Sequence, residues 1–250
     1  MPKLNIPKKS DEKTATSGKC RTAAYFSDPI VYCLCAVALL SLTYVVSDIV
    51  IGLSVFQKIA LNLIIFASLY VLGLIKAKNG ERAFMRKMYF LMLLFYVYFL
   101  VSATLLDRSL GRDVLGNAAS AMDRREYYKY WFVNLKPFHT VKTIYIDALK
   151  NGYLSLGYVI FNALGNFLIL APAAILIPAV SKRFAKPYFL FPILLLSTLA
   201  IEGLQYLFMR GSCDVDDVIF NFVGAAAIRL IVMIPPIGSL VDKIMLTDRS

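Results

Sequence analysis

Charged side chains are scarce in this chain. Asp, Glu, Lys and Arg make up 17% of its 250 residues, whereas a soluble domain has about 25%. Histidine occurs once, as His139, and no serine or cysteine partner is evident, so the sequence does not support a nucleophilic triad. The shortage of charge excludes an ordinary soluble domain.

Cysteine is too sparse to form a framework. The four thiols are those of Cys20, Cys33, Cys35 and Cys213. Cys33 and Cys35 stand two apart in an apolar run, so on a helix they point in different directions. Because no CxxC pair, zinc-type spacing or disulfide pattern emerges, we expect small apolar residues and one loop thiol.

Apolar residues are abundant instead. They make up 59% of the chain, and the mean hydropathy is +0.66. The net charge of +11 comes from Lys and Arg that lie between apolar runs and form no single basic face. That distribution is typical of membrane orientation and of contact with anionic headgroups. The sequence therefore predicts an all-α integral membrane protein with lipids, and no nucleic acid, as partners.

Six apolar runs approach the roughly 20 residues that a helix needs to cross a hydrocarbon core of about 30 Å. They cover residues 30–50, 58–75, 88–106, 157–180, 188–208 and 218–237. Only Ser47-Asp48 and the region from Gly52 to Lys58 separate the first two, so five spans is the alternative to six. No A-x-A-like cleavage site follows the first run, and we expect it to remain as an anchor.

Polar segments divide the chain into regions. These are a basic tail (1–28), N-terminal transmembrane helices (29–106), an amphipathic loop (107–152), a core with the last three spans (134–237) and a second tail (238–250). Lys and Arg concentrate in the first tail and in alternate connections, so six spans would place both termini in the cytoplasm and the long loop outside.

Aromatic residues follow charged ones within the long loop. Residues 118–131 contain Asp123-Arg-Arg-Glu126 and then several Tyr and Trp residues. This pattern is typical of an interfacial helix with its rings at headgroup level. The alternative is a polar loop whose aromatic side chains pack on the helix bundle.

Polar side chains recur in pairs within the last three spans. The pairs are Asn162 and Asn166, Glu202 and Gln205, and Asp217 and Asn221. Spacings of three or four place each pair on one helix face. At about 1.5 Å per residue, those inside the membrane lie roughly 6 to 14 Å from the outer helix ends. Because ionisable groups at such depth are costly, we expect one functional site that opens to the extracytoplasmic face.

The connection before the last span adds more charge to this site. Asp214, Asp216 and Asp217 stand where a helix begins, and three acids exceed what one helix cap needs. Arg210 is expected to pair with Glu202 or with a phosphate or carboxylate of a ligand. Arg229 lies about 18 Å deeper than Asp217 and is not expected to belong to the site.

At these residues the sequence resembles the VanZ-like family of small bacterial membrane proteins, from about Asn134 to Ala227. The matching stretches are Asn134-Leu-Lys-Pro137-Phe138, Asn162, Gly165-Asn166, Pro172, Glu202-x-x-Gln205, Arg210, Asp214-Val-Asp216-Asp217, Asn221 and Gly224. Ala174 and Ile228 stand where the family often has glycine. Without the second glycine, the sequence does not decide whether a close Gly-x-x-x-Gly helix contact forms at Gly224.

The resemblance implies a multi-pass protein of the bacterial cytoplasmic membrane with a role in resistance to the glycopeptide antibiotic teicoplanin. It supplies no reaction. It also marks a set of motif residues as structural: Asn134, Pro137, Phe138, Gly165, Pro172 and Gly224.

Three functions fit these observations, and we rank a non-enzymatic binding protein of the cell envelope first. Its ligand would be the headgroup of an envelope lipid, a cell-wall precursor or a lipoglycopeptide, with no cofactor and no catalytic residue. The ligand-binding residues would be Glu202, Gln205, Arg210, Asp214, Asp216, Asp217, Asn221, Asn162 and Asn166.

The second function is that of a membrane hydrolase acting on a lipid-linked phosphate. Asp214, Asp216 and Asp217 would hold Mg²⁺ or Ca²⁺ through oxygen ligands, and Glu202 would be the general base. The third is a small transporter, although the chain shows no clear pair of repeated halves.

Overall fold

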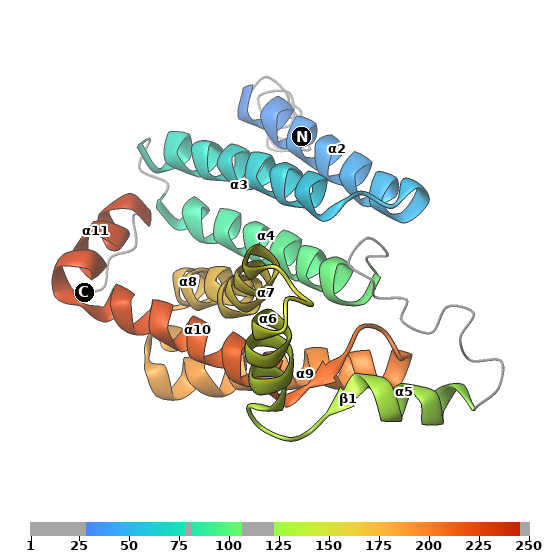
Figure 1. The fold of residues 1–250 in the computed structure, drawn as a ribbon. Coiled ribbons are helices and arrows are strands. Elements are labelled where there is room, and N and C mark those ends of the chain that lie inside the picture. The colour runs from blue at the N-terminus through green and yellow to red at the C-terminus, as the bar shows by residue number, and fades with distance from the viewer. Residues whose placement is uncertain (1–28, 79–81, 107–122, 246–250) are drawn as a thin grey trace, which may run out of the picture.

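The computed structural model describes residues 29–78, 82–106 and 123–245. The N-terminal helices are α2 (Pro29–Ile51), α3 (Val55–Lys78) and α4 (Arg82–Val101), which continues as the short π-helix η1 (Ser102–Leu106). In Figure 1, α4 lies between α3 and α8, and α2 lies at the edge of the molecule. The N-terminal helices therefore join the rest of the bundle mainly through α4.

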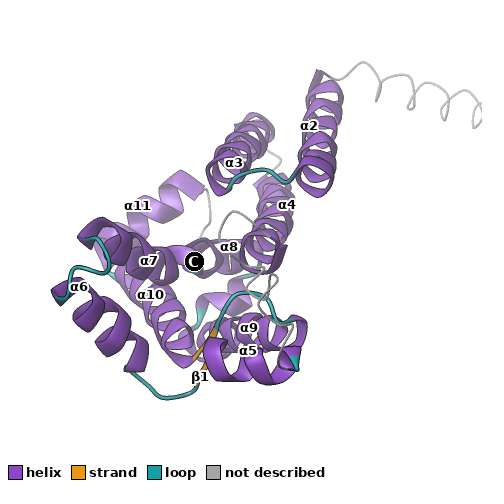
Figure 2. Cartoon of the chain, turned by 45° about the vertical axis from the view of Figure 1, so that its right-hand side comes forward, coloured by secondary structure: helices purple, strands orange, loops and turns teal. Residues whose placement is uncertain are grey.

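The C-terminal part begins with elements that lie at one end of the bundle. They are α5 (Arg124–Phe132), β1 (Val133–Asn134), the π-helix η3 (Val141–Asp147) and α6 (Ala148–Lys150). The longer helices are α7 (Leu156–Ile169), α8 (Ala171–Val180), α9 (Pro187–Phe208), α10 (Val215–Met233) and α11 (Pro235–Met245). A 3-10 turn, η4 (Lys182–Ala185), precedes α9, and β2 (Cys213–Asp214) precedes α10. Figure 2 shows α5 and β1 beside α9.

Five helical segments of the described chain are long and apolar enough to cross a membrane. They are Cys33–Ile51, Phe56–Ala77, Ala83–Leu105, Leu156–Val180 and Pro187–Phe208. A sixth span results if α10 and α11, which are bent by 91°, are counted as one. This confirms the predicted all-helical membrane protein with five or six spans, and the first two apolar runs form separate helices.

The apolar run at 157–180 corresponds to one candidate span, Leu156–Val180, which the structure divides at Leu170 into α7 and α8. Pro172 is the second residue of α8; it lacks an N–H group, and its ring would clash with a preceding helical turn. At the break, the Tyr96 hydroxyl of α4 donates a hydrogen bond to the carbonyl of Ile169. A side chain from a neighbouring helix thus satisfies a carbonyl at the interruption.

The run at 218–237 is also divided between two helices. Here α10 ends at Met233, and α11 covers Pro235–Met245. Ile234 has an extended ψ of 124°, because the residue before a proline avoids the helical region. The hydroxyl of Tyr70 donates to the carbonyl of Ile244 at 2.7 Å, so α11 folds back toward α3 (Figure 1). Residues 246–250 lie outside the described part.

A close helix contact forms at Gly224 even though Ile228 replaces the second glycine. A Cβ atom at Gly224 would lie 1.7 Å from the backbone oxygen of Phe167. The backbones of α10 and α7 therefore touch, and a single glycine is enough for this contact. It fixes the start of α10 relative to α7, which is the geometry on which the site depends.

Candidate functional site

The end of the bundle where α9 ends and α10 begins is called the acidic end, because Asp214, Asp216 and Asp217 lie there. The strand β1 pairs in parallel with β2 and so lies at the acidic end. Val133 pairs with Cys213, and Asn134 pairs with Asp214. The Asn134 amide Nδ2 then donates to Asp214 Oδ1 at 3.0 Å. The Asn134 motif is thereby joined to the acidic segment 80 residues later.

Asp214 is the N-cap of α10. Its carboxylate accepts hydrogen bonds from the backbone N–H of Asp216 at 2.8 Å and from the hydroxyl of Thr140. The backbone N–H of Asp214 donates to Glu202 Oε2 at 2.9 Å. Glu202 is 6% exposed, so a buried carboxylate of α9 stabilises the backbone of β2.

Asp216 holds the loop that follows β1. Its side chain is 1% exposed and accepts backbone hydrogen bonds from Phe138, from Thr140 at 2.9 Å and from Val141 at 3.2 Å. Phe138 has φ of 60°, a left-handed conformation that is uncommon outside glycine. Three donors to one carboxylate can hold such a turn, so Asp216 serves the architecture of the loop.

Asp217 and Asn166 meet across two helices. The Asn166 amide Nδ2 donates to Asp217 Oδ1, which connects α7 to the first turn of α10. Asn162, one turn earlier on α7, donates to the carbonyl of Tyr158 at 2.9 Å. This polar face of α7 and the start of α10 border one cavity.

The cavity at the acidic end has a volume of about 630 Å³. Carboxylates of Asp214 and Asp217 line it together with the amides of Asn134, Asn162 and Asn166. Lys136 and His139 supply basic groups, and five aromatic residues supply rings: Tyr130, Trp131, Phe132, Tyr145 and Tyr158. The volume and the mixture of rings with a few polar groups are those of a small-ligand site.

The nine residues predicted to bind ligand divide into two sets. Asn162, Asn166, Asp214 and Asp217 line the cavity. Glu202, Gln205, Arg210, Asp216 and Asn221 do not line it. A cavity is therefore present at the helix junction where the site was predicted. The role of the nine residues in ligand binding stays a prediction.

The second set connects helices or stabilises turns. Gln205 Nε2 donates to the Thr104 carbonyl of η1 at 3.1 Å, and Asn221 Nδ2 donates to Thr198 Oγ1 of α9 at 3.2 Å. Arg210 follows the left-handed C-cap Met209, and its backbone N–H donates to the Gln205 carbonyl at 2.9 Å. The contacts of Gln205 and Asn221 join α9 to η1 and to α10, and the backbone of Arg210 closes the end of α9.

The three aspartates do not converge on one point. Asp214 faces Asn134 and Thr140, Asp216 faces backbone N–H groups, and Asp217 faces Asn166. Among the described residues, no group of three or more His, Cys, Asp and Glu side chains is arranged to hold a metal ion. Each of the three carboxylates is thus held by its own set of hydrogen-bond donors.

The carboxylates make the surroundings of the cavity electrostatically negative. Burial, followed by Glu202, Asp214 and Asp217, raises the pKa of the Cys213 thiol to about 11. Burial and then the charges of Asp217 and Asp214 raise the pKa of Tyr145 to about 12. Both groups remain neutral at physiological pH, and the same field favours cationic or hydroxyl-bearing ligands over bare anions.

Labelling of Cys213 should report this field. Because the thiolate is the reactive form, a pKa of about 11 should slow maleimide labelling at pH 8 by up to about 100-fold relative to an ordinary thiol. The rate should rise as the pH approaches 11, and Asp217→Asn should increase it at pH 8 by removing a negative charge. The measurement uses the protein with the other three cysteines replaced by serine. A rate equal to that of a free thiol would contradict the assignment.

The aromatic segment forms a helix that packs on the bundle through one of its rings. Helix α5 covers Arg124–Phe132, with Asp123 as N-cap, and residues 118–122 of the predicted helix lie outside the described part. Tyr128 is fully buried, and its hydroxyl donates to the Gln205 carbonyl at 3.2 Å. Tyr130 and Trp131 are 74% and 63% exposed. The helix packs on α9 through Tyr128, and the position of the exposed rings at headgroup level stays a prediction.

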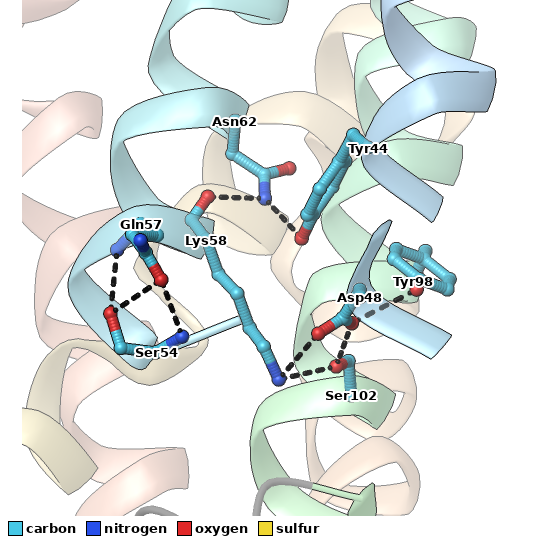
Figure 3. A network of polar contacts seen from close by, with 8 residues as sticks. All are labelled: Tyr44, Asp48, Ser54, Gln57, Lys58, Asn62, Tyr98 and Ser102. Carbon is cyan, nitrogen blue, oxygen red and sulfur yellow. Dashed lines mark hydrogen bonds and ion pairs between the residues drawn. The ribbon is translucent and has the colours of Figure 1, made fainter. Parts of the chain in front are cut away.

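A second polar cluster lies in the N-terminal helices, where the sequence analysis had placed no site (Figure 3). Lys58 Nζ forms an ion pair with Asp48 Oδ1 at 3.0 Å and donates to Ser102 Oγ at 2.9 Å. Ser102 and Tyr98 donate to Asp48 Oδ2 at 2.6 and 2.9 Å. The pair connects α2, α3 and the end of α4 inside an apolar bundle.

The same short π-helix, η1, touches both polar regions. Ser102 belongs to the Asp48–Lys58 cluster, whereas the carbonyl of Thr104 accepts the hydrogen bond of Gln205. The cluster therefore lies at the acidic end of the bundle. Asp48 and Lys58 had been noted only as interruptions between apolar runs, although a charge pair across a short turn within the membrane is a site signal by itself.

A comparison with protein families identifies the family of the chain. A model of the VanZ/LLP1 family matches residues 89–235, more than half of the chain, and this range includes every residue that lines the cavity. The chain belongs to the VanZ/LLP1 family. The VanZ/LLP1 region begins within α4, upstream of the Asn134 at which the resemblance had been placed, and it leaves out Asp48 and Lys58. No curated protein and no solved structure matches the chain significantly.

Proposed function

We propose that this VanZ/LLP1 protein is a non-enzymatic binding protein of the bacterial cytoplasmic membrane. Its cavity at the acidic end would face outward and receive the polar headgroup of an envelope lipid, a cell-wall precursor or a lipoglycopeptide. The observation that carries the proposal is the cavity of about 630 Å³ that brings Asp217, Asn166 and aromatic rings together.

The chemistry of the wall indicates which headgroups fit. Carboxylates accept from hydroxyl, amide and ammonium groups, and asparagine amides both donate and accept. The aromatic faces beside them can cover the apolar side of a sugar ring or an acyl chain. A headgroup rich in hydroxyl and amide groups, as in a glycan or a peptide stem, matches this set.

The charges in the cavity wall further restrict which part of a headgroup can bind. Two carboxylates, Asp214 and Asp217, face one lysine, Lys136, in the cavity wall. Arg210 was expected to hold a ligand phosphate, yet it does not line the cavity. We therefore propose that the sugar or peptide part of the headgroup enters the cavity, with Lys136 as the nearest cation for any phosphate.

Drug susceptibility tests this proposal in cells. A host that carries the gene should tolerate more teicoplanin than the same host without it, whereas vancomycin, which lacks the lipid tail, should differ less. Asp217→Ala and Asn166→Ala each remove one partner of the pair in the cavity wall. Each should lower teicoplanin tolerance toward that of the gene-free host.

A matched control separates the cavity from the surface charge. Glu126 is an exposed carboxylate on α5 that does not line the cavity, so Glu126→Ala should leave tolerance unchanged. Membrane levels of each variant are compared by immunoblot. Full tolerance in an Asp217→Ala variant at normal levels would argue against a role for the cavity, as would an equal loss in Glu126→Ala.

A further inference from the structure

A second cavity lies at the other end of the bundle, where α8 ends and α9 begins, which we call the basic end. Its volume is about 440 Å³. It is bordered by the end of α8, η4, the end of α10 and α11. Lys182, Lys186 and Arg229 line it together with one carboxylate, that of Asp242. Three cationic side chains thus face one anionic side chain, the reverse of the balance at the acidic end.

Arg229 is built into the protein and does not extend from the surface. Its side chain is 4% exposed, and Nη2 donates to the carbonyl of Ala185 in η4. A guanidinium has five donors in a fixed plane and can bind more than one acceptor at a time. Arg229 belongs to this cavity and not to the acidic one, in agreement with its predicted depth.

Helix α11 forms one wall of the cavity. It turns by 91° from α10 and contributes Val241, Asp242 and Met245 to the lining. The hydroxyl of Tyr89 on α4 donates to the Met245 carbonyl at 2.7 Å. This bond and the equivalent one from Tyr70 hold α11 against α3 and α4, so the cavity has a fixed wall.

The remaining lining is apolar and continuous with the transmembrane helices. Ile175 and Ala179 of α8 and Val232 and Met233 of α10 lie beside the cations. A free anion would gain nothing from these side chains, whereas an acyl chain would bury them. The cavity therefore combines a cationic mouth with an apolar wall at the end of the bundle where α8 and α10 end.

We propose that the cavity at the basic end binds the phosphate of an anionic phospholipid, with the first part of an acyl chain against α8 and α10. Arg229 would contact the phosphate oxygens through its planar donor set, and Lys182 and Lys186 would supply point charges at the mouth. This binding would fix α11 and the ends of α8 and α10 at the membrane surface. The inference is independent of any ligand at the acidic end.

Lipid binding to the full-length purified protein tests the proposal. The probes are phosphatidylglycerol, phosphatidylcholine and inorganic phosphate, and the readouts are native mass spectrometry and thermal stability in detergent. Phosphatidylglycerol should bind more tightly than phosphatidylcholine. Since each lysine near a headgroup contributes roughly fivefold, Lys182→Gln with Lys186→Gln should weaken its binding by roughly 25-fold.

The same turn offers a matched control. Arg183 lies between these lysines in the sequence, but its guanidinium lies 4.6 Å from the ring centroid of Phe189 and does not line the cavity. Arg183→Gln should therefore retain the binding of phosphatidylglycerol. Equal affinity for the two lipids, an equal loss in Arg183→Gln, or binding of inorganic phosphate as tight as that of the lipid would each overturn the proposal.

Discussion

Lys58→Met is expected to destabilise the protein by about 3–5 kcal/mol, because it leaves the Asp48 carboxylate buried without its ion-pair partner. Both side chains are largely buried, at 3% and 5% exposure, so solvent cannot replace the lost charge. In a protein of this size the midpoint of thermal unfolding should fall by roughly 10 °C or more. Size-exclusion chromatography of heated, detergent-solubilised protein measures the fall.

A double variant separates the loss of charge pairing from the loss of packing. Asp48→Asn combined with Lys58→Met removes both charges and keeps an acceptor for the hydroxyls of Ser102 and Tyr98. Replacing both members of a buried ion pair is often nearly neutral, so the double variant should recover most of the stability. A double variant as unstable as Lys58→Met alone would show that the pair is not the cause.

Gly224→Ala is the second change with a large expected effect. The new Cβ would lie 1.7 Å from the Phe167 oxygen and 2.6 Å from its carbonyl carbon, and both are backbone atoms that cannot rotate away. Helices α7 and α10 would have to separate, at a cost of about 3 kcal/mol. The midpoint of thermal unfolding should fall by roughly 10 °C, and the cavity between these helices should be disturbed.

Gly203→Ala is the matched control for this prediction. Gly203 lies within α9, and a Cβ there would meet no atom within 4 Å. The substitution should leave the midpoint almost unchanged, since it adds a methyl group in open space. If both variants melt alike, the close contact between α7 and α10 would not be what makes glycine necessary at position 224.

Lys58→Met and Gly224→Ala disturb different contacts at the acidic end. Gly224 sets the distance between the helices that carry Asn166 and Asp217. Lys58 holds the end of α4, whose π-helical continuation η1 bonds to Gln205 of α9. If the cavity binds a headgroup, both variants should also lower teicoplanin tolerance, in proportion to the folded protein that remains.

The class of the protein could be predicted from its sequence because hydropathy over about 20 residues decides whether a helix enters a membrane. Each of the six apolar runs therefore corresponds to helical structure, and Asn166 and Asp217 could be expected to belong to one site from their spacing and depth. The Asn134 motif could be assigned only by resemblance. The ends of helices were less predictable: Pro172 and Pro235 break runs that hydropathy alone treats as continuous.

The amino-acid sequence by itself determined the membrane class, a range of five to six spans and the segment that carries the acidic residues. Only the tertiary structure decided which of those residues face a cavity. Asp214, Asp216 and Asp217 are near neighbours in the chain, yet each carboxylate meets donors about 50 to 80 residues away. The direction of a side chain depends on such distant partners, whereas hydropathy and spacing are local properties of the chain.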